Sequence, residues 1–157
     1  MNQSIYFCKS WFRAKKRPTD VWSEKQARDA HVKKKPYTIL VGSVDHPTCF
    51  VEVTEKFSGV AFLDDLLRER LTYQFQSVGF GRVFLTMATY REFENDTDKV
   101  VSGTSYIFSQ DGNIQIRREV FSPHRIETST SSGSVAANFA PVPEFGEYDN
   151  LIHVERG

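Results

Sequence analysis

The chain has 157 residues, of which 13% are aromatic, with 20 basic and 20 acidic side chains. This length fits a single domain that can bury a core without disulfides or metals. Two cysteines are too few for a disulfide framework, and no apolar run approaches the roughly 18 residues of a membrane helix. The first residues lack the basic and apolar regions of a signal peptide, so we expect a cytoplasmic protein without membrane contact.

The zero net charge hides a strong asymmetry along the chain. Residues 1–36 carry ten Lys or Arg against three Asp or Glu, and residues 37–157 carry ten against seventeen. Such a split is typical of nucleic-acid or membrane contact, or of two parts that face each other in the fold.

The first elements are predicted to be a strand and a helix. Ser4 to Phe12 is short and aromatic, as strands are, and the basic residues 13–17 follow as a loop. A helix is expected to start at Thr19 or Ser23 and to run to about Lys34, before Pro36 stops it. Ser23 and Gln26 have the spacing of a capping box.

A hairpin and a second helix are predicted next. Tyr37 to Val44 and Thr48 to Thr54 are rich in β-branched and aromatic residues, with a turn at residues 45–47. From Phe62 to about Gln76, apolar residues recur every fourth position, which predicts an amphipathic helix: Leu63, Leu67, Leu71 and Phe75. Gly79-Phe80-Gly81 is expected to end that helix.

Three consecutive strands, forming a β-meander, are predicted at Arg82 to Phe93, Val100 to Phe108 and Asn113 to Phe121. Asp111-Gly112 between the last two is a strong hairpin signal. On the third strand one face is mostly apolar, with Ile114, Ile116, Arg118 and Val120, and the other is mostly polar. This alternation predicts a sheet that is covered on one side and wet on the other.

Residues 122–150 are predicted to be irregular or extended. Glu127 to Ser134 has the small polar composition of a flexible loop, and Phe139 to Pro143 is expected to be extended. Leu151 to Val154 is predicted to be a short strand or a docked tail. The fold class expected for residues 1–157 is therefore a single α+β domain. Its mostly antiparallel sheet has a meander in the C-terminal half and is packed on one face by one or two helices.

The sequence contains no pattern that indicates catalysis, a metal or a cofactor. The four histidines lie at least fifteen residues apart, whereas metal ligands usually come in closely spaced pairs. Cys8 and Cys49 lie in predicted strands and are expected to be buried free thiols. No nucleophile elbow and no phosphate-binding loop is present. We therefore expect a protein that is not an enzyme and has no cofactor and no metal site.

Three classes of function remain open. The first is a protein-binding module, because interfaces favour the aromatic and arginine anchors in which this chain is rich. The alternative is a small-molecule-binding domain or minor enzyme with a pocket between helix and sheet. A second alternative is a nucleic-acid binder, in which Trp11, Phe12 and Trp22 stack on bases beside the basic residues of Lys9 to Lys35.

The chain also resembles a known group of proteins. Phe62-Leu-Asp-Asp-Leu-Leu-Arg68, Val83-Phe-Leu-Thr-Met-Ala-Thr89 and Ser105-Tyr-Ile-Phe108 are similar in style to the helix and meander of immunity proteins of bacterial polymorphic toxin systems. The resemblance implies a stoichiometric inhibitor that covers the active site of a cognate toxin.

Under this hypothesis the partner-binding residues are acidic and aromatic, because an acidic patch can mimic phosphate and steer association with a basic cleft. The first group, near the C-terminus, is Glu144, Phe145, Glu147, Tyr148 and Asp149. The second group is Asp96 and Asp98, in the turn between the first two meander strands.

Overall fold

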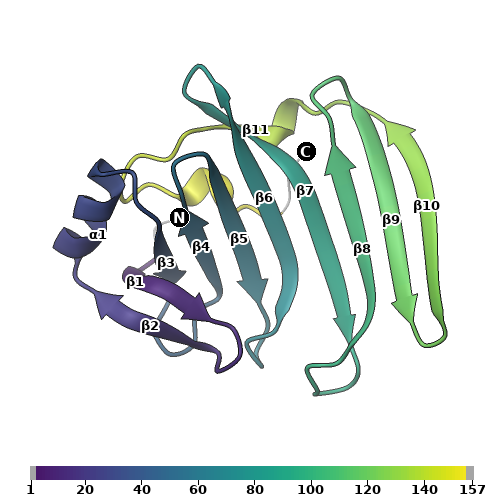
Figure 1. Cartoon of the computed structure of the whole chain (residues 1–157), viewed down its shortest axis with the longest axis horizontal. Helices are drawn as coiled ribbons and strands as arrows, with labels where there is room; N and C mark the ends of the chain where they lie inside the picture. Colours follow the sequence, from purple (N-terminus) through teal and green to yellow (C-terminus); the bar gives the residue numbers. More distant parts are fainter. Residues whose placement is uncertain (1–2, 155–157) are drawn as a thin grey trace.

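One antiparallel sheet dominates the computed structural model, which describes residues 3–154 (Figure 1). Its strands are β1 (Ile5–Phe12), β2 (Arg17–Trp22), β3 (Tyr37–Val41), β4 (Cys49–Val53), β5 (Phe57–Leu63), β6 (Glu69–Gly79), β7 (Arg82–Phe93), β8 (Val100–Phe108), β9 (Asn113–Phe121), β10 (His124–Ser132) and β11 (Phe139–Pro141). Strands β3 to β10 follow each other across the sheet in chain order, β1 and β2 continue it beyond β3, and β11 pairs with β7.

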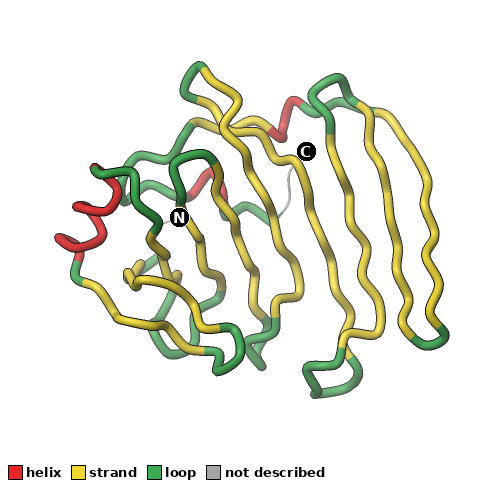
Figure 2. The backbone as a smooth tube through the Cα atoms, in the orientation of Figure 1, coloured by secondary structure: helices red, strands yellow, loops and turns green. Residues whose placement is uncertain are grey.

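The prediction of a mostly antiparallel sheet with a meander in the C-terminal half is confirmed. The sheet is, however, accompanied by a single α-helix in the described part of the chain, α1 (Glu24–Val32), and by two short 3-10 helices, η1 (Ala136–Asn138) and η2 (Asp149–Leu151). Figure 2 shows how little of the backbone is helical. The fold is therefore mainly β, and α+β is only a loose description of it.

Helix α1 begins where the capping box predicts. The backbone N–H of Gln26 donates to Ser23 Oγ at 3.2 Å, and the backbone N–H of Ser23 donates to Gln26 Oε1 at 2.9 Å. These bonds satisfy groups that a helix start otherwise leaves unpaired. Ala27 and Ala30 form the buried side of the helix and pack on the sheet.

The predicted helix from Phe62 to Gln76 is wrong, because these residues end β5 and form most of β6. Residues four apart share a face in a strand as well as in a helix, so the spacing of four did not separate the two. Within β6 the buried residues Leu71, Tyr73 and Phe75 alternate with more exposed ones, which is the period of a strand.

The Gly79-Phe80-Gly81 segment therefore ends no helix. Phe80 and Gly81 form the two-residue turn between β6 and β7, with φ of 57° and 68°. Positive φ at both central residues is the geometry of a tight hairpin turn, and glycine adopts it without strain.

The prediction of a flexible loop from Glu127 to Ser134 is also wrong. Residues 124–132 are β10, which pairs with β9 at nine successive positions. The expectation of an irregular segment at 122–150 holds only beyond this strand. The extended conformation predicted for Phe139 to Pro143 is confirmed by β11 for residues 139–141.

The main core lies on one face of strands β3 to β7, under α1 and residues 142–154. The largest buried side chains of this face include Tyr37, Ile39 and Phe75. Leu151 is fully buried there, so residues 149–151 dock on the core, in agreement with the docked tail expected at this position. A smaller cluster lies on the opposite face, where Trp11 stacks on Phe50 with ring centroids 5.5 Å apart.

Burial falls steeply across the sheet. All five residues of β3 are buried, whereas none of the nine residues of β10 is. The predicted apolar face of β9 exists, but Ile114, Ile116 and Val120 are only partly buried. The expectation that one side of the sheet is covered is therefore wrong for β9.

Candidate functional site

The C-terminal aromatic residues expected to bind a partner contact their own chain instead. Tyr148 is 4% exposed, and its hydroxyl lies 2.8 Å from that of Tyr37. The Tyr37 hydroxyl lies in turn 2.7 Å from Nδ1 of His31. Tyr148 thus belongs to the core in this structure and is not available as an interface anchor.

Burial shifts the pKa values of all three of these rings. Burial, together with the bond between the two hydroxyls, raises the pKa of Tyr37, and burial raises that of Tyr148. Burial, and secondarily the nearby Arg28, lowers the pKa of His31 below its ordinary 6.5. At neutral pH this chain of hydrogen bonds therefore joins neutral groups.

Phe145 is also engaged within the molecule. Its ring stacks on Phe7 with centroids 5.2 Å apart, and the Arg28 guanidinium lies 4.5 Å from its centroid. By contrast, the neighbouring carboxylates Glu144, Glu147 and Asp149 are exposed and form no ion pair with any described residue. Of the first predicted group, only the carboxylates face outward without a partner.

The second predicted group lies in an ordered turn between β7 and β8. Asp98 accepts a bond from Lys16 Nζ at 2.6 Å, and Asp96 is exposed. Arg68 fixes this turn, because its Nη1 donates to the carbonyls of Asn95 and Thr97, both at 2.8 Å.

The two acidic groups are not brought together. The Asp96 turn follows the end of β7, whereas residues 142–149 continue from β11, which pairs with the first residues of that strand. Because β7 has 12 residues and a strand rises about 3.3 Å per residue, its ends lie roughly 35 Å apart. A single compact partner site that contains both groups does not fit this geometry.

Asp64 orients Arg68 and is the carboxylate with the most internal bonds. Its oxygens accept from the backbone N–H groups of Leu66 and Arg68 at 3.0 Å each, and from Arg68 Nε at 2.8 Å. Burial alone would raise the pKa of Asp64, but these bonds outweigh it and hold the pKa below its ordinary 3.8.

We expect Asp64→Asn to lower the free energy of unfolding at pH 7 by about 2 kcal/mol, since it leaves the half-buried Arg68 without its counter-ion. A carboxylate with a lowered folded pKa stabilises the fold above its unfolded pKa, and this contribution is lost as the pH falls through the folded pKa. Urea denaturation from pH 7 to pH 3 should therefore show the gap to the wild type narrowing below about pH 4. Asp65→Asn, an exposed neighbour without such bonds, is the control, and an equal effect there would refute the assignment.

The basic N-terminal segment faces the acidic part of the chain. Arg13 pairs with Glu52 at 2.7 Å and with Glu69 at 3.0 Å, on β4 and β6. Trp11, expected to stack on bases, is 4% exposed. Of the two explanations for the charge asymmetry, these contacts favour two parts that face each other.

The two cysteines, the potential metal ligands and the length of the helices can also be compared with the predictions from the sequence. Cys8 and Cys49 are buried free thiols, as predicted, and burial raises the pKa of each to about 12. Raised pKa values favour the protonated thiol at neutral pH, which is the less nucleophilic form. Residues 3–154 contain no cluster of three potential metal ligands. Nor do they contain a helix of the length and hydrophobicity required to cross a membrane.

The most unusual surface is the open sheet, which we define as strands β8, β9 and β10. Ser102 is its only buried side chain apart from the turn, and Phe108 is its only residue packed against the main core. In Figure 1 these strands stand to one side as a single layer, away from α1 and from residues 142–154. The open sheet is therefore accessible on both faces.

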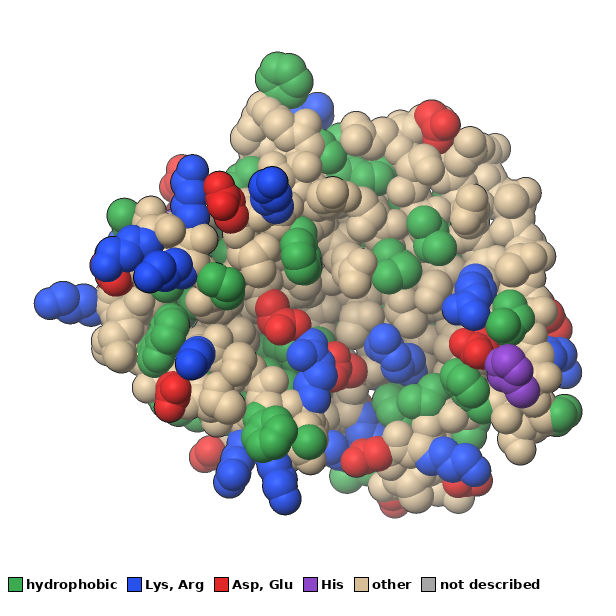
Figure 3. Space-filling model, viewed as in Figure 1, with side chains coloured by type: hydrophobic (Ala, Val, Ile, Leu, Met, Phe, Trp, Pro, Cys, Tyr) green, Lys and Arg blue, Asp and Glu red, His purple; other side chains and the backbone are tan. Residues whose placement is uncertain are grey.

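Both faces of the open sheet carry apolar side chains. One face continues from the main core and has Tyr106, Ile114, Ile116 and Val120 beside Tyr90 of β7. The opposite face has the exposed Ile107, Phe121 and Ile126. Figure 3 shows this second face, with few charged side chains over the upper parts of β9 and β10.

The two edges of the large sheet differ. The edge strand β2 has six residues and contains Pro18, and Asp20 has a φ of 45°, features that hinder the addition of another strand. The edge strand β10 has nine residues without proline or glycine, and within residues 3–154 its outer edge is unpaired. Its backbone is therefore free to accept one more strand.

The sequence analysis missed β10, although a signal exists. Thr128 and Thr130 are β-branched and alternate with serines, which suits an exposed strand better than a flexible loop. No protein-family model, curated protein or solved structure matches the chain, so the resemblance to immunity proteins stays a prediction.

Proposed function

We propose that this protein is a non-catalytic protein-binding module whose partner adds a strand to β10. The observation that carries the proposal is the edge strand itself, since all nine of its residues are exposed and its outer side is unpaired among the described strands. In strand addition, backbone hydrogen bonds supply affinity, and alternate side chains supply specificity.

The single layer of the open sheet supports the same proposal. A sheet normally buries at least one face against a second layer. Here Ile114, Ile116 and Val120 lie on one face and Ile126 on the other, and no second layer covers β9 or β10 in the described chain. A partner that pairs with β10 and folds over either face would bury this apolar surface.

Within this proposal the partner is a toxin that the chain neutralises, a role that follows from the resemblance to immunity proteins. Such a partner is expected to carry a basic cleft. The unpaired carboxylates Glu144, Glu147, Asp149 and Asp96 would then accelerate association through long-range attraction rather than as buried contacts. In this proposal the acidic groups attract the partner at long range, and the open sheet forms the direct contacts with it.

A pair of matched variants tests the proposal. Ile126→Asp places a charge on β10, and Val21→Asp makes the same change at an exposed β-branched residue of the opposite edge strand. Tagged wild type and both variants are used to capture partners from a bacterial lysate treated with nuclease. We expect one stoichiometric protein with the wild type and Val21→Asp, and a reduction of at least about tenfold with Ile126→Asp, because a buried unpaired charge opposes binding.

The captured protein is then assayed for activity with and without an equimolar amount of the chain. Inhibition that is complete at one equivalent supports neutralisation, and unchanged activity contradicts it. Equal capture by the wild type and Ile126→Asp would remove β10 from the interface. Capture that disappears with nuclease would favour nucleic acid as the partner instead.

A further inference from the structure

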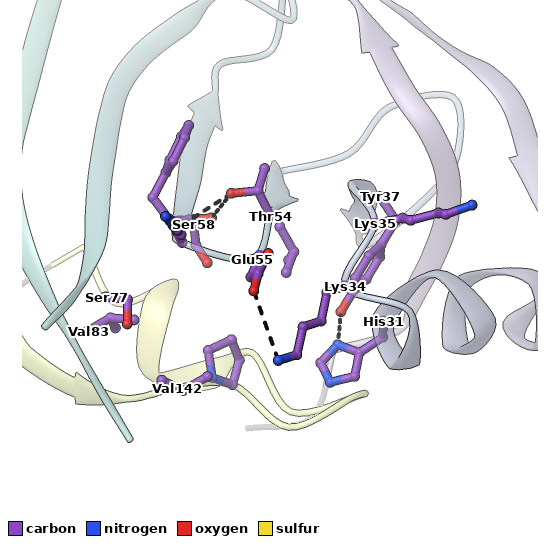
Figure 4. A pocket seen from close by; sticks show the side chains of 14 residues that line it. His31, Lys34, Lys35, Tyr37, Thr54, Glu55, Ser58, Ser77, Val83 and Val142 are labelled. Atoms are coloured by element: carbon purple, nitrogen blue, oxygen red, sulfur yellow. Dashed lines mark hydrogen bonds and ion pairs between the residues drawn. The ribbon is translucent and has the colours of Figure 1, made fainter. Parts of the chain in front are cut away.

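A cavity of about 490 Å³ lies between the end of α1 and the residues that follow β11, and no residue of the open sheet lines it (Figure 4). Its walls come from the end of α1, the turn between β4 and β5, the start of β5, and the residues that follow β11. This volume is within the range of small-molecule sites, roughly 300–1,000 Å³. Segments from both ends of the chain enclose it, so it is formed only by the complete fold.

Ser58 is the most informative residue of this cavity. It is 3% exposed, lies on the main-core face of β5 between Val53 and Phe75 of the neighbouring strands, and lines the cavity. Its hydroxyl bonds to no described residue, although buried hydroxyls nearly always have a partner. Because Ser58 lines the cavity, an ordered water or a ligand held there would complete the hydrogen bonding of this hydroxyl.

His31 supplies a second polar atom from the opposite wall. Its Nδ1 is engaged with the Tyr37 hydroxyl, whereas Nε2 bonds to no described residue. Burial lowers the pKa of His31, which favours the neutral ring at pH 7. In that ring Nε2 donates when the Tyr37 hydroxyl donates to Nδ1, and accepts when Nδ1 donates to that hydroxyl. His31 therefore offers a ligand one ring nitrogen that no described residue engages.

The charge around the cavity is mainly positive. Lys34 and Lys56 line it against the single carboxylate of Glu55, and Lys35 lines it as well, although Figure 4 shows its ammonium pointing away. Figure 4 shows Lys34 reaching across the opening toward Glu55, and the two charged atoms lie 3.9 Å apart. Such a long, exposed ion pair contributes little free energy, so Lys34 can turn to another anion at low cost.

The remaining lining is largely apolar. Val53, Val83 and the ring of Tyr37 are buried at its base, and Val142 and Pro143 form the wall on the C-terminal segment. An apolar base, together with a hydroxyl, a ring nitrogen and lysines near the opening, fits a ligand with two unlike ends. We propose that this cavity binds a small organic anion with an apolar body, such as a carboxylate on a hydrocarbon chain.

The probe for this site is decanoate, and decyltrimethylammonium is the matched cation with the same chain. Both are titrated calorimetrically into the full-length protein at pH 7. We expect decanoate to bind with a stoichiometry near one and at least about tenfold more tightly than the cation, because a hydrogen-bonded charge adds an affinity factor of this size. Equal affinity for the two probes would overturn the assignment of an anion site.

Three variants locate the binding. The double variant Lys34→Glu, Lys56→Glu should lower the affinity for decanoate by at least about tenfold. The control Lys15→Glu, Lys25→Glu makes the same change of charge away from the cavity and should leave that affinity unchanged. Ser58→Ala breaks no internal hydrogen bond, so it should leave the melting temperature unchanged and weaken decanoate several-fold.

Two outcomes would refute the site. Decanoate affinity that is unaffected by both the lysine pair and Ser58→Ala means that the cavity does not hold it. Decanoate affinity that falls instead with Ile126→Asp means that the probe binds the open sheet. The cavity and the strand-addition surface share no residue, so either proposal can fail while the other stands.

Discussion

Tyr148→Ala is expected to lower the free energy of unfolding by about 4 kcal/mol, the largest effect of any single change considered for this chain. The side chain is 4% exposed and packs in the main core, and its hydroxyl bonds to Tyr37. Its removal leaves a cavity the size of an aromatic ring between the C-terminal segment and the sheet. Urea denaturation followed by tryptophan fluorescence measures the change.

Two companion variants separate the contributions at this site. Tyr148→Phe removes only the hydroxyl and should cost about 1 kcal/mol. Phe80→Ala removes a whole aromatic ring that is 97% exposed at the tip of the hairpin between β6 and β7, and should change stability by less than about 0.5 kcal/mol. An unfolding midpoint for Tyr148→Ala equal to that of the wild type would show that residues 142–154 do not dock on the core.

The second large effect is expected from a proline substitution in β10. Whether it lowers the stability of the fold or prevents strand addition depends on the exact position. Adjacent residues of a strand direct their N–H groups to opposite edges, so one of Ser129 and Thr130 bonds to β9 and the other points to the free edge. Proline removes the N–H group in both cases. One of Ser129→Pro and Thr130→Pro should therefore destabilise β10, and the other should leave the fold intact and prevent strand addition.

Thermal unfolding identifies which variant is which, and partner capture then gives the decisive comparison. The stable variant should lose the partner by at least about a hundredfold, because a missing bond and a ring at the shared edge both oppose pairing. If both variants are as stable as the wild type, β10 is not held by β9. Full partner capture by the stable variant would exclude strand addition at this edge.

The parts of the fold that could be predicted from the sequence are those with local causes. The capping box of Ser23 and Gln26 fixes the start of α1 through bonds between residues three apart. The Asp111-Gly112 turn and the alternation on either side of it fix the hairpin of β8 and β9. Both features require no knowledge of the rest of the chain.

Strand β6 shows why a pattern can mislead. Leu67, Leu71 and Phe75 satisfy the spacing of a helix face, but Leu71 and Phe75 also satisfy that of a strand face, with Tyr73 between them. The choice is made by β5 and β7, which pair with β6 on its two sides. Long-range pairing of this kind overrides local preference and is not visible in a window of fifteen residues.

The partner-binding residues show a different limit. Glu144 and Tyr148 come from the same short acidic and aromatic segment, yet one faces solvent and the other lies in the core. That difference arises from Tyr37 and His31, which lie more than a hundred residues earlier in the chain. The free edge of β10 also could not be predicted from the local sequence, because an edge is defined by the strand order of the whole sheet.

The position of the docked tail in the chain has a consequence for biosynthesis. Ala140, Tyr148 and Leu151 close the same face of the core that Phe7 and α1 cover from the other end of the sequence. During translation the strands of the meander emerge in the order in which they pair, so the sheet can form progressively from hairpins. The apolar face of β3 to β7 nevertheless stays exposed until the last of its covering residues leaves the ribosome. The nascent chain is therefore expected to depend most on chaperones until residues 140–151 have emerged and can dock on the core.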